Sequence, residues 1–192
     1  MNTHITNGAF STSFAKRKTW KINPGLQKAL LAATNIGDYI LDVGAGIGRY
    51  VEWFHDEERF ACGIDGTPDI ANISDGKVLE VDFSHPDAPD LIAFKFSEPF
   101  DLTICIEVIE HIPAELMDTF LDNFTKLNTD RLIVSCAVLN QRGRDHVSCH
   151  QPYWVANQFG ARGFVIDEPE TERLRKIAGK GWDHKLLVFT SG

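Results

Sequence analysis

Two carboxylates and a histidine lie within five residues of one another in the segment Glu107-Val108-Ile109-Glu110-His111. If the chain turns helical after Glu107, all three side chains can face the same side. Carboxylates and imidazoles can exchange protons with a substrate, and they can also hold a divalent metal ion. Two further histidines, His146 and His150, follow in a later polar stretch. The sequence therefore predicts a cluster of ionisable side chains.

Three interpretations of this cluster stay open. In the first, Glu107 and its neighbours only contact a cofactor and cap the turn before Pro113. In the second, His111 or His146, together with Glu110, removes the proton from a substrate hydroxyl. In the third, the cluster binds Mg²⁺, Mn²⁺ or Zn²⁺, which would lower the pKa of a bound hydroxyl. The ligands would then be Glu107, Glu110, His111 and a later histidine, His146 or His150.

A glycine-rich loop identifies the elements that must position these residues. The apolar run 39–41 ends in Asp42 and is followed at alternate positions by three glycines, Gly44, Gly46 and Gly48. Glycines allow a sharp turn and let a ligand approach the main chain closely. The dinucleotide pattern G-x-G-x-x-G is not met, because Arg49 stands at its third glycine position. No Gly-Lys-Ser/Thr follows, which argues against a phosphate loop.

Three further short apolar runs end in acidic residues. Residues 60–64 lead to Asp65, residues 77–81 to Asp82 and Phe83, and residues 100–106 to Glu107. Each run has the length of a buried strand. An acidic residue that closes the second strand about twenty residues after the first glycine suits hydrogen bonds from ribose hydroxyls.

The order of these features from Tyr39 to Val138 resembles the class I, Rossmann-like S-adenosylmethionine (SAM)-dependent methyltransferases. The resemblance implies SAM as cofactor, with the glycine loop under its amino-acid end. It also implies that Asp65 binds the ribose, that Asp82 binds the adenine amino group and that Phe83 touches the ring. The cofactor-binding residues expected in this way are Asp42, Gly44, Ala45, Gly46, Gly48, Asp65, Asp82, Phe83 and Glu107.

Two narrower resemblances concern the acceptor. Residues 132–153 resemble uncharacterised small-molecule methyltransferases of bacteria and phages. The E-x-x-E-H segment with a later histidine resembles the metal-ligand pattern of small-RNA 2′-O-methyltransferases. The net charge of −8 argues against nucleic acid as a partner, because a basic surface is expected there.

Alternating strands and helices predict one α/β domain over residues 24–192. We expect a Rossmann-like, doubly wound, seven-stranded and mostly parallel sheet, with one antiparallel edge strand and helices on both faces. The last strands, 164–166 and 186–190, would be joined by a short polar stretch. Residues 1–23 are interpreted either as a loosely held, solvated lead-in or as a lid, with Phe14 or Trp20 closing over the cofactor or acceptor. The fifth strand is expected at 131–138 and the helices at 24–35, 49–56, 87–95, 114–127 and 153–162.

Composition sets the remaining limits. A chain of 192 residues with 43% hydrophobic and 24% charged residues suits one globular domain. It has no apolar run of the ~20 residues that span a bilayer, and its start lacks a secretory pattern. Four scattered cysteines favour a reducing compartment. These features predict a cytoplasmic protein and leave its oligomeric state open.

The expected activity is methyl transfer from SAM to a hydroxyl of a small-molecule or sugar-like acceptor. An oxygen acceptor must lose its proton, and the cluster of glutamates and histidines suits that step. The alternatives are N-methylation of a small amine or peptide, and a non-catalytic SAM-binding subunit. A nicotinamide oxidoreductase is opposed by Arg49.

Overall fold

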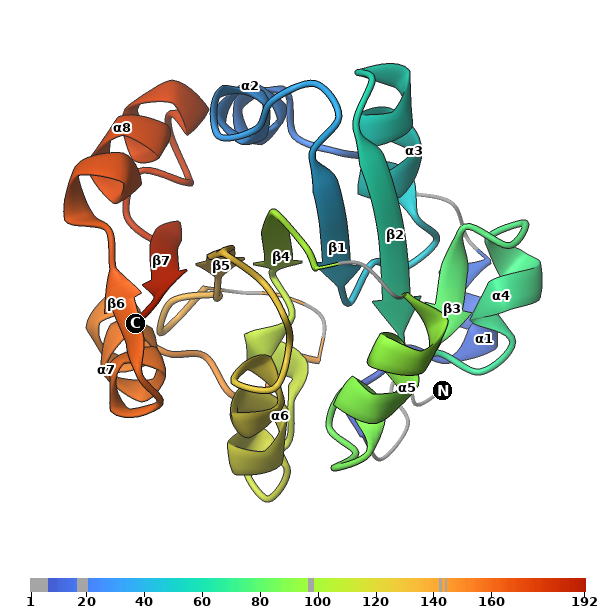
Figure 1. Cartoon of the computed structure of the whole chain (residues 1–192). Coiled ribbons are helices and arrows are strands. Elements are labelled where there is room, and N and C mark those ends of the chain that lie inside the picture. Colours follow the sequence, from blue (N-terminus) through green and yellow to red (C-terminus); the bar gives the residue numbers. More distant parts are fainter. Residues whose placement is uncertain (1–6, 17–20, 97–98, 142, 144) are drawn as a thin grey trace.

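The computed structural model describes residues 7–16, 21–96, 99–141, 143 and 145–192. In this part of the chain, a seven-stranded sheet lies between two layers of helices (Figure 1). The strands are β1 (Tyr39–Val43), β2 (Phe60–Asp65), β3 (Val78–Glu80), β4 (Leu102–Ile106), β5 (Arg131–Ser135), β6 (Phe164–Ile166) and β7 (Leu187–Ser191). The helices are α1 (Thr12–Ala15), α2 (Pro24–Ala32), α3 (Arg49–Asp56), α4 (Ile70–Ile73), α5 (Ala88–Lys95), α6 (Met117–Phe124), α7 (Pro152–Ala161) and α8 (Glu168–Ala178), with a 3₁₀ turn at Ile109–His111.

The strand order is β3-β2-β1-β4-β5-β7-β6. The pairs β1–β2, β1–β4, β2–β3 and β4–β5 are parallel, whereas β7 runs antiparallel to both β5 and β6. The predicted seven-stranded, mostly parallel sheet is therefore confirmed, with its antiparallel pairing at the expected end. On that side of the sheet, β7 is an interior strand between β5 and β6, and β6 is the edge strand.

The prediction of a short polar connection between the last two strands is wrong. This connection contains α8, whose N-cap residue Asp167 accepts a hydrogen bond from the backbone N–H of Glu170 at 3.0 Å. Leu174 and Ala178 are buried against the sheet, while most of the helix surface is polar. Because the apolar stripe is narrow, the charged composition concealed the helix, although the N-cap aspartate was a usable signal.

Two other deviations concern the ends of elements. The helix expected at 114–127 is limited to α6, with turns on both sides, and the strand expected at 131–138 ends at Ser135. The short helices α1 and α4 were not predicted. Four-residue helices carry too little apolar periodicity to be recognised in a sequence.

Each face of the sheet is covered by its own apolar layer. On one face, Phe124 lies between Phe120 and Phe159 with ring centroids 5.4 Å apart in both pairs, joining α6 to α7. On the other face, Leu30 of α2 and Phe54 of α3 are fully buried together with residues of α8. Burying such a side chain stabilises the fold by about 1.5–3 kcal/mol. The two layers fix the sheet and leave the carboxyl ends of its parallel strands open for a site.

The N-terminal segment 7–16 packs beside the ends of β2 and β3, where α1 lies next to α4 (Figure 1). The Thr12 hydroxyl donates to the backbone oxygen of Pro68 at 2.9 Å, and Ala15 packs with Ile70. Phe14 is buried, so it is part of this packing. Trp20, the other residue expected in a lid, lies outside the described residues.

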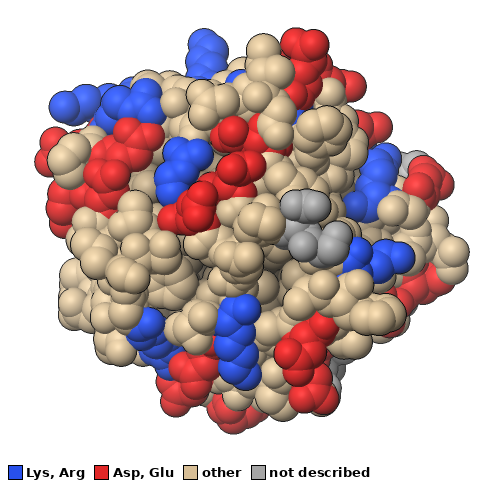
Figure 2. All heavy atoms as spheres, in the orientation of Figure 1, with Lys and Arg blue, Asp and Glu red and all other residues tan. Residues whose placement is uncertain are grey.

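Charges of both signs are mixed on the surface. Figure 2 shows Lys and Arg side chains next to Asp and Glu across the face seen there, including the area over α8 and α2. An ion pair between Glu170 and Arg173 on α8 is one such neighbour pair. Among the described residues, no helix has the length and apolar character needed to cross a membrane.

Asn123 links α6 to the loop that follows β3. Its side-chain amide donates to the backbone oxygens of Phe83 and His85, both at 2.8 Å, and the residue is buried. Replacing Asn123 by Ala leaves two carbonyl groups unpaired, so we expect the free energy of unfolding to fall by about 2 kcal/mol. Urea unfolding measures this change. The adjacent exposed Asp122→Ala should cost less than about 1 kcal/mol, and an equal cost for both variants would contradict the prediction.

Candidate active site

The glycine loop closes tightly over the end of β1. Gly44 has φ +80°, and its N–H donates to the oxygen of Ile64 at 2.9 Å. A Cβ atom on Gly44 would overlap the side chain of Val108. Gly46, also at positive φ, donates to the Asp65 carboxylate at 2.9 Å. Both positions therefore need glycine for their positive φ, and Gly44 also needs it for its close approach to Val108.

Asp65 ties the loop to the end of β2. One carboxylate oxygen accepts the N–H of Gly46, and the other accepts the N–H of Thr67 at 2.8 Å. Each carboxylate oxygen has a further lone pair for a ligand hydroxyl. Asp65 thus supports the loop and has acceptor capacity left for a ligand hydroxyl.

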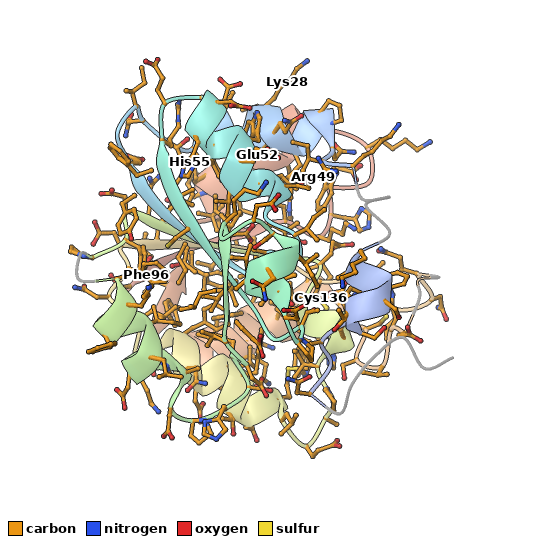
Figure 3. The ribbon with its side chains drawn as sticks, turned by 90° about the vertical axis from the view of Figure 1, so that its right-hand side faces the viewer. Lys28, Arg49, Glu52, His55, Phe96 and Cys136 are labelled. Atoms are coloured by element: carbon orange, nitrogen blue, oxygen red, sulfur yellow. The ribbon has the colours of Figure 1, made fainter. Side chains whose placement is uncertain are left out.

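Arg49, at the position of the missing third glycine, is the first residue of α3. Figure 3 shows α3 with Arg49 at its start and Glu52 and His55 further along. The Arg49 side chain lines the larger of the two cavities described next. Gly48, at φ +77°, turns the chain into the helix, which explains why a glycine stands one position early.

Two cavities meet at the carboxyl ends of the parallel strands. The smaller, of about 80 Å³, lies near Asp82, Phe83 and residues 7–10. The larger, of about 400 Å³, lies near Asp42, Gly46, Glu110 and His146. Five residues line both cavities and mark their junction: Phe10, Gly44, Asp65, Glu107 and His111.

The end of β3 forms one wall of the smaller cavity. Asp82 accepts from the backbone N–H and the hydroxyl of Ser84, at 2.9 and 2.6 Å. Phe83 is buried edge-to-face against Phe120 and Phe124. The ring expected to touch an adenine is therefore held by the core, which fixes its position.

Asp42 carries a buried carboxyl below the glycine loop. Its Oδ2 atom has no hydrogen-bond partner within the described residues. Burial, and then the charge of Asp65, raise the pKa of Asp42 to about 8. The isolated protein therefore holds this carboxyl mostly protonated at neutral pH, and a cationic ligand group would favour its ionised form.

Glu107 is held from three directions. It has φ +56°, a conformation that a non-glycine residue adopts only when its surroundings impose it. Ser135 donates to Oε1 at 2.8 Å, and Gln141 and Lys185 donate to Oε2 at 3.2 and 2.6 Å. The carboxylate is thus oriented and charge-balanced at the cavity junction.

Glu110, His111 and His146 form the predicted cluster. One potential ligand atom from each lies within 4.8 Å of those of the other two, and Glu107 is not part of this group. The fold brings the two histidines together because the backbone oxygen of Glu110 accepts hydrogen bonds from the backbone N–H groups of Val147 and Ser148, at 2.8 and 2.9 Å. These bonds attach the later loop to the 3₁₀ turn.

Glu110 is fully buried, and neither of its carboxyl oxygens has a hydrogen-bond partner among the described residues. Burial, followed by the charge of Glu107, raises the pKa of Glu110 to about 8. An unpaired buried carboxylate is costly, so the group needs a proton or a cation. Such an orphaned acid beside two histidines is suited to either.

Both histidines of the cluster are oriented by the same loop. His111 Nδ1 lies 3.2 Å from the oxygen of Asp145, and His146 Nδ1 lies 3.2 Å from the oxygen of Gln141. A carbonyl only accepts, so Nδ1 carries the proton and Nε2 keeps its lone pair in the neutral ring. The rings are 5.1 Å apart. His146 also contacts Cys149, with Sγ 3.5 Å from Nδ1.

His150 lies outside the cluster of Glu110, His111 and His146. Its ring is stacked on Trp154 with centroids 3.4 Å apart, and burial lowers its pKa. Of the two later histidines, His146 is therefore the one that joins Glu110 and His111. The ring of Trp154 is thus engaged by His150.

Four residues at the site were missed by the sequence interpretation: Phe10, Gln141, Trp182 and Lys185. Trp182 and Lys185 precede β7, and only the antiparallel direction of that strand places them at the carboxyl ends of the others. Phe10, rather than Phe14, contacts His111, with ring centroids 5.2 Å apart. No local pattern marks any of these positions.

The raised pKa of Glu110 predicts a pH dependence of stability. A carboxyl with a higher pKa in the folded state binds more protons there than in the unfolded chain between about pH 4.5 and 8. Its stabilisation is therefore complete below that range and is lost as pH rises through it. We expect the free energy of unfolding, measured in the presence of a chelator, to fall between pH 5.5 and 7.5 in both proteins. The fall should be smaller in Glu110→Gln than in the wild type, and the difference between the two falls should be about 1–3 kcal/mol. Urea unfolding at both pH values measures this, with the exposed Glu115→Gln as control. Equal losses in the wild type and Glu110→Gln would refute it.

Comparison with known proteins adds a family match. Residues 40–129 match the model of a family described as a methyltransferase domain. No curated protein sequence matches the chain significantly.

Several solved structures share the whole fold at low sequence identity. Magnesium protoporphyrin IX methyltransferase of Synechocystis PCC 6803 with bound SAM is 16% identical, with a TM-score of 0.62 over 94% of this chain and 92% of that one. An O-methyltransferase of Brevibacillus brevis with S-adenosylhomocysteine (SAH) is 17% identical, with a TM-score of 0.61 over 88% and 72%. A 1,6-didemethyltoxoflavin N1-methyltransferase of Burkholderia thailandensis with SAH is 17% identical, with a TM-score of 0.57 over 92% and 82%. These likenesses show the fold, and the proteins compared include an O-methyltransferase and an N1-methyltransferase. The chain thus has the fold of the class I SAM-dependent methyltransferases and matches a methyltransferase domain over residues 40–129.

Proposed function

We propose that this protein transfers a methyl group from SAM to a hydroxyl of a small-molecule or sugar-like acceptor. The observation that carries the proposal is the cluster of Glu110, His111 and His146 next to the junction of the two cavities. Such a cluster is not needed to bind the cofactor, but it suits an acceptor that must lose a proton.

The two cavities suit the two ends of SAM. The smaller one, with Asp65, Asp82 and Phe83, would hold the adenosine end, and the larger one, with Asp42 and the glycine loop, would hold the methionine end. Since the sulfur joins these two parts, the sulfonium would lie at the junction. There His111 and Phe10 would flank the methyl group.

The smaller cavity, at about 80 Å³, is below the 300–1,000 Å³ typical of ligand sites. Residues 7–10 form one of its walls, and Gly8 lies directly against the backbone oxygen of His111. We therefore infer that this segment moves outward to admit adenosine and then closes. This agrees with the interpretation of residues 1–23 as a lid, with Phe10 as the residue over the site.

The reaction needs little chemistry from the protein, because the sulfonium is already activated. The acceptor oxygen would attack the methyl carbon, and the carbon–sulfur bond would break with its electron pair left on sulfur, giving SAH. The proton of the hydroxyl would pass to Nε2 of His111 or His146. The backbone oxygen of Glu110, which holds the loop, and the carbonyl bonds to Nδ1 would keep both rings aligned.

A divalent metal ion is the second way in which the cluster could serve the reaction. The orphaned carboxylate of Glu110 and two imidazoles with fixed Nδ1 protons fit such an ion, and this donor set suits Zn²⁺ or Mn²⁺ better than Mg²⁺. Bound there, the ion would lower the pKa of the acceptor hydroxyl. Glu107, the fourth ligand expected from the sequence, is engaged by Lys185.

The other proposals drawn from the sequence stand beside this one. N-methylation of a small amine or peptide would need the same cofactor site without proton removal, and a non-catalytic SAM-binding subunit would need only the cofactor site. A small molecule as acceptor, the absence of nucleic acid among the partners, and a cytoplasmic location also remain proposals.

Cofactor binding is tested by calorimetric titration with SAM, SAH and NADH. We expect SAM and SAH to bind and NADH not to bind. Asp65→Ala should weaken SAM binding by about tenfold or more, because a charged hydrogen-bond acceptor for the ribose is lost. The exposed Asp87→Ala serves as control. Binding of NADH alone would refute the assignment, and unchanged SAM affinity in Asp65→Ala would refute the placement of the ribose.

Methyl transfer is tested with labelled SAM and a panel of sugars, phenols and amines, with and without chelator. We expect transfer to a hydroxyl compound, and a loss of about 10²–10⁴-fold in His146→Ala, as for removal of a general base. His150→Ala should keep most of the activity, because His150 is stacked on Trp154 away from the cluster. Chelator-sensitive transfer would identify the metal variant of the mechanism. Transfer to amines only, or full activity of His146→Ala, would contradict the proposal.

A further inference from the structure

Lys185 reaches the site from the antiparallel strand. In β5 and β7, Val134 lies opposite Leu187, so the residues before β7 lie at the carboxyl end of β5. Lys185 is only 7% exposed, and its Nζ atom lies 2.6 Å from Oε2 of Glu107. A lysine buried to this degree usually has a specific partner. Here that partner is the carboxylate at the cavity junction.

The ammonium group of Lys185 has two favourable contacts. Besides Glu107, its ammonium lies over the ring of Trp182, 4.5 Å from the centroid. The positive charge is thus shared between a carboxylate and an aromatic face. At the junction of the two cavities, the negative charge of Glu107 is therefore largely offset.

This balance matters because of what the junction would hold. SAM carries a positive sulfonium, whereas its product SAH carries a neutral sulfur at the same place. An unbalanced carboxylate beside the sulfur would favour SAM over SAH. Methyl transfer removes the positive charge, so holding the sulfonium too strongly would stabilise the reactant and raise the barrier.

We propose that Lys185 sets the selectivity of the site between SAM and SAH by offsetting the charge of Glu107 beside the sulfonium. Lys185 is a positioning residue in this view, because it acts through Glu107 and not on the methyl group. The inference rests on the proposed function, since it requires SAM at the two cavities. It adds a role for a residue that the transfer chemistry itself does not use.

The test is a calorimetric titration of wild type, Lys185→Met and Lys185→Arg with SAM and with SAH. In Lys185→Met, Glu107 keeps its bonds from Ser135 and Gln141 and loses its cationic partner. We expect the ratio of the SAH to the SAM dissociation constant to rise by about tenfold in Lys185→Met. Lys185→Arg should return the ratio to within about twofold of the wild type, because it restores the charge.

A double variant separates charge from packing. Lys185→Met combined with Glu107→Gln removes both charges and keeps similar side-chain volumes, so its ratio should stay close to that of the wild type. The single variant Glu107→Gln leaves Lys185 unbalanced and should shift the ratio by about tenfold in the opposite direction. This second change keeps the proposal testable if Lys185→Met does not fold.

An unchanged ratio in Lys185→Met, or in Glu107→Gln if Lys185→Met does not fold, would overturn the role of Lys185 while both ligands still bind. A rise in the ratio that persists in the double variant would also overturn it, because the effect would then come from packing. Failure of the wild type to bind either SAM or SAH would instead refute the proposed function.

Discussion

Parallel pairing of β1 with both β2 and β4 is the constraint on which the site depends. It places the ends of these strands at one edge of the sheet, so that Asp42, Asp65 and Glu107 meet there although they are far apart in the chain. Backbone hydrogen bonds and two apolar layers hold this register. The glycine loop can then be tight, because Gly44 and Gly46 each donate to atoms of β2.

Bringing several carboxyl groups together is electrostatically unfavourable, and the structure offsets this differently at each position. Asp42 and Glu110 are buried with pKa values raised to about 8, so that protons neutralise them in the isolated protein. Glu107 forms an ion pair with Lys185. The same edge therefore offers one charge-balanced carboxylate and two carboxyl groups that can ionise when a cation arrives. This division suits a site that binds a positively charged cofactor and also handles a proton.

The loop after β5 holds several side chains of the site in place. Gln141 bonds to Glu107, the backbone of the loop orients both histidines, and Val147 and Ser148 bond to the oxygen of Glu110. Solved structures with the same fold act on oxygen and on nitrogen acceptors, so the sheet does not decide the acceptor. In this chain, residues of the loop and Phe10 of the N-terminal segment line the larger cavity.

The sequence by itself determined the features that depend on local pattern. The glycine loop, the acidic strand ends and the E-x-x-E-H turn were recognisable because short-range spacing fixes backbone turns and the ends of buried strands. Long-range packing decided the rest. Lys185 meets Glu107 across 78 positions only because β7 runs antiparallel beside β5. The choice of His146 over His150 likewise depends on which ring Trp154 stacks against, and spacing along the chain carries no information about such contacts.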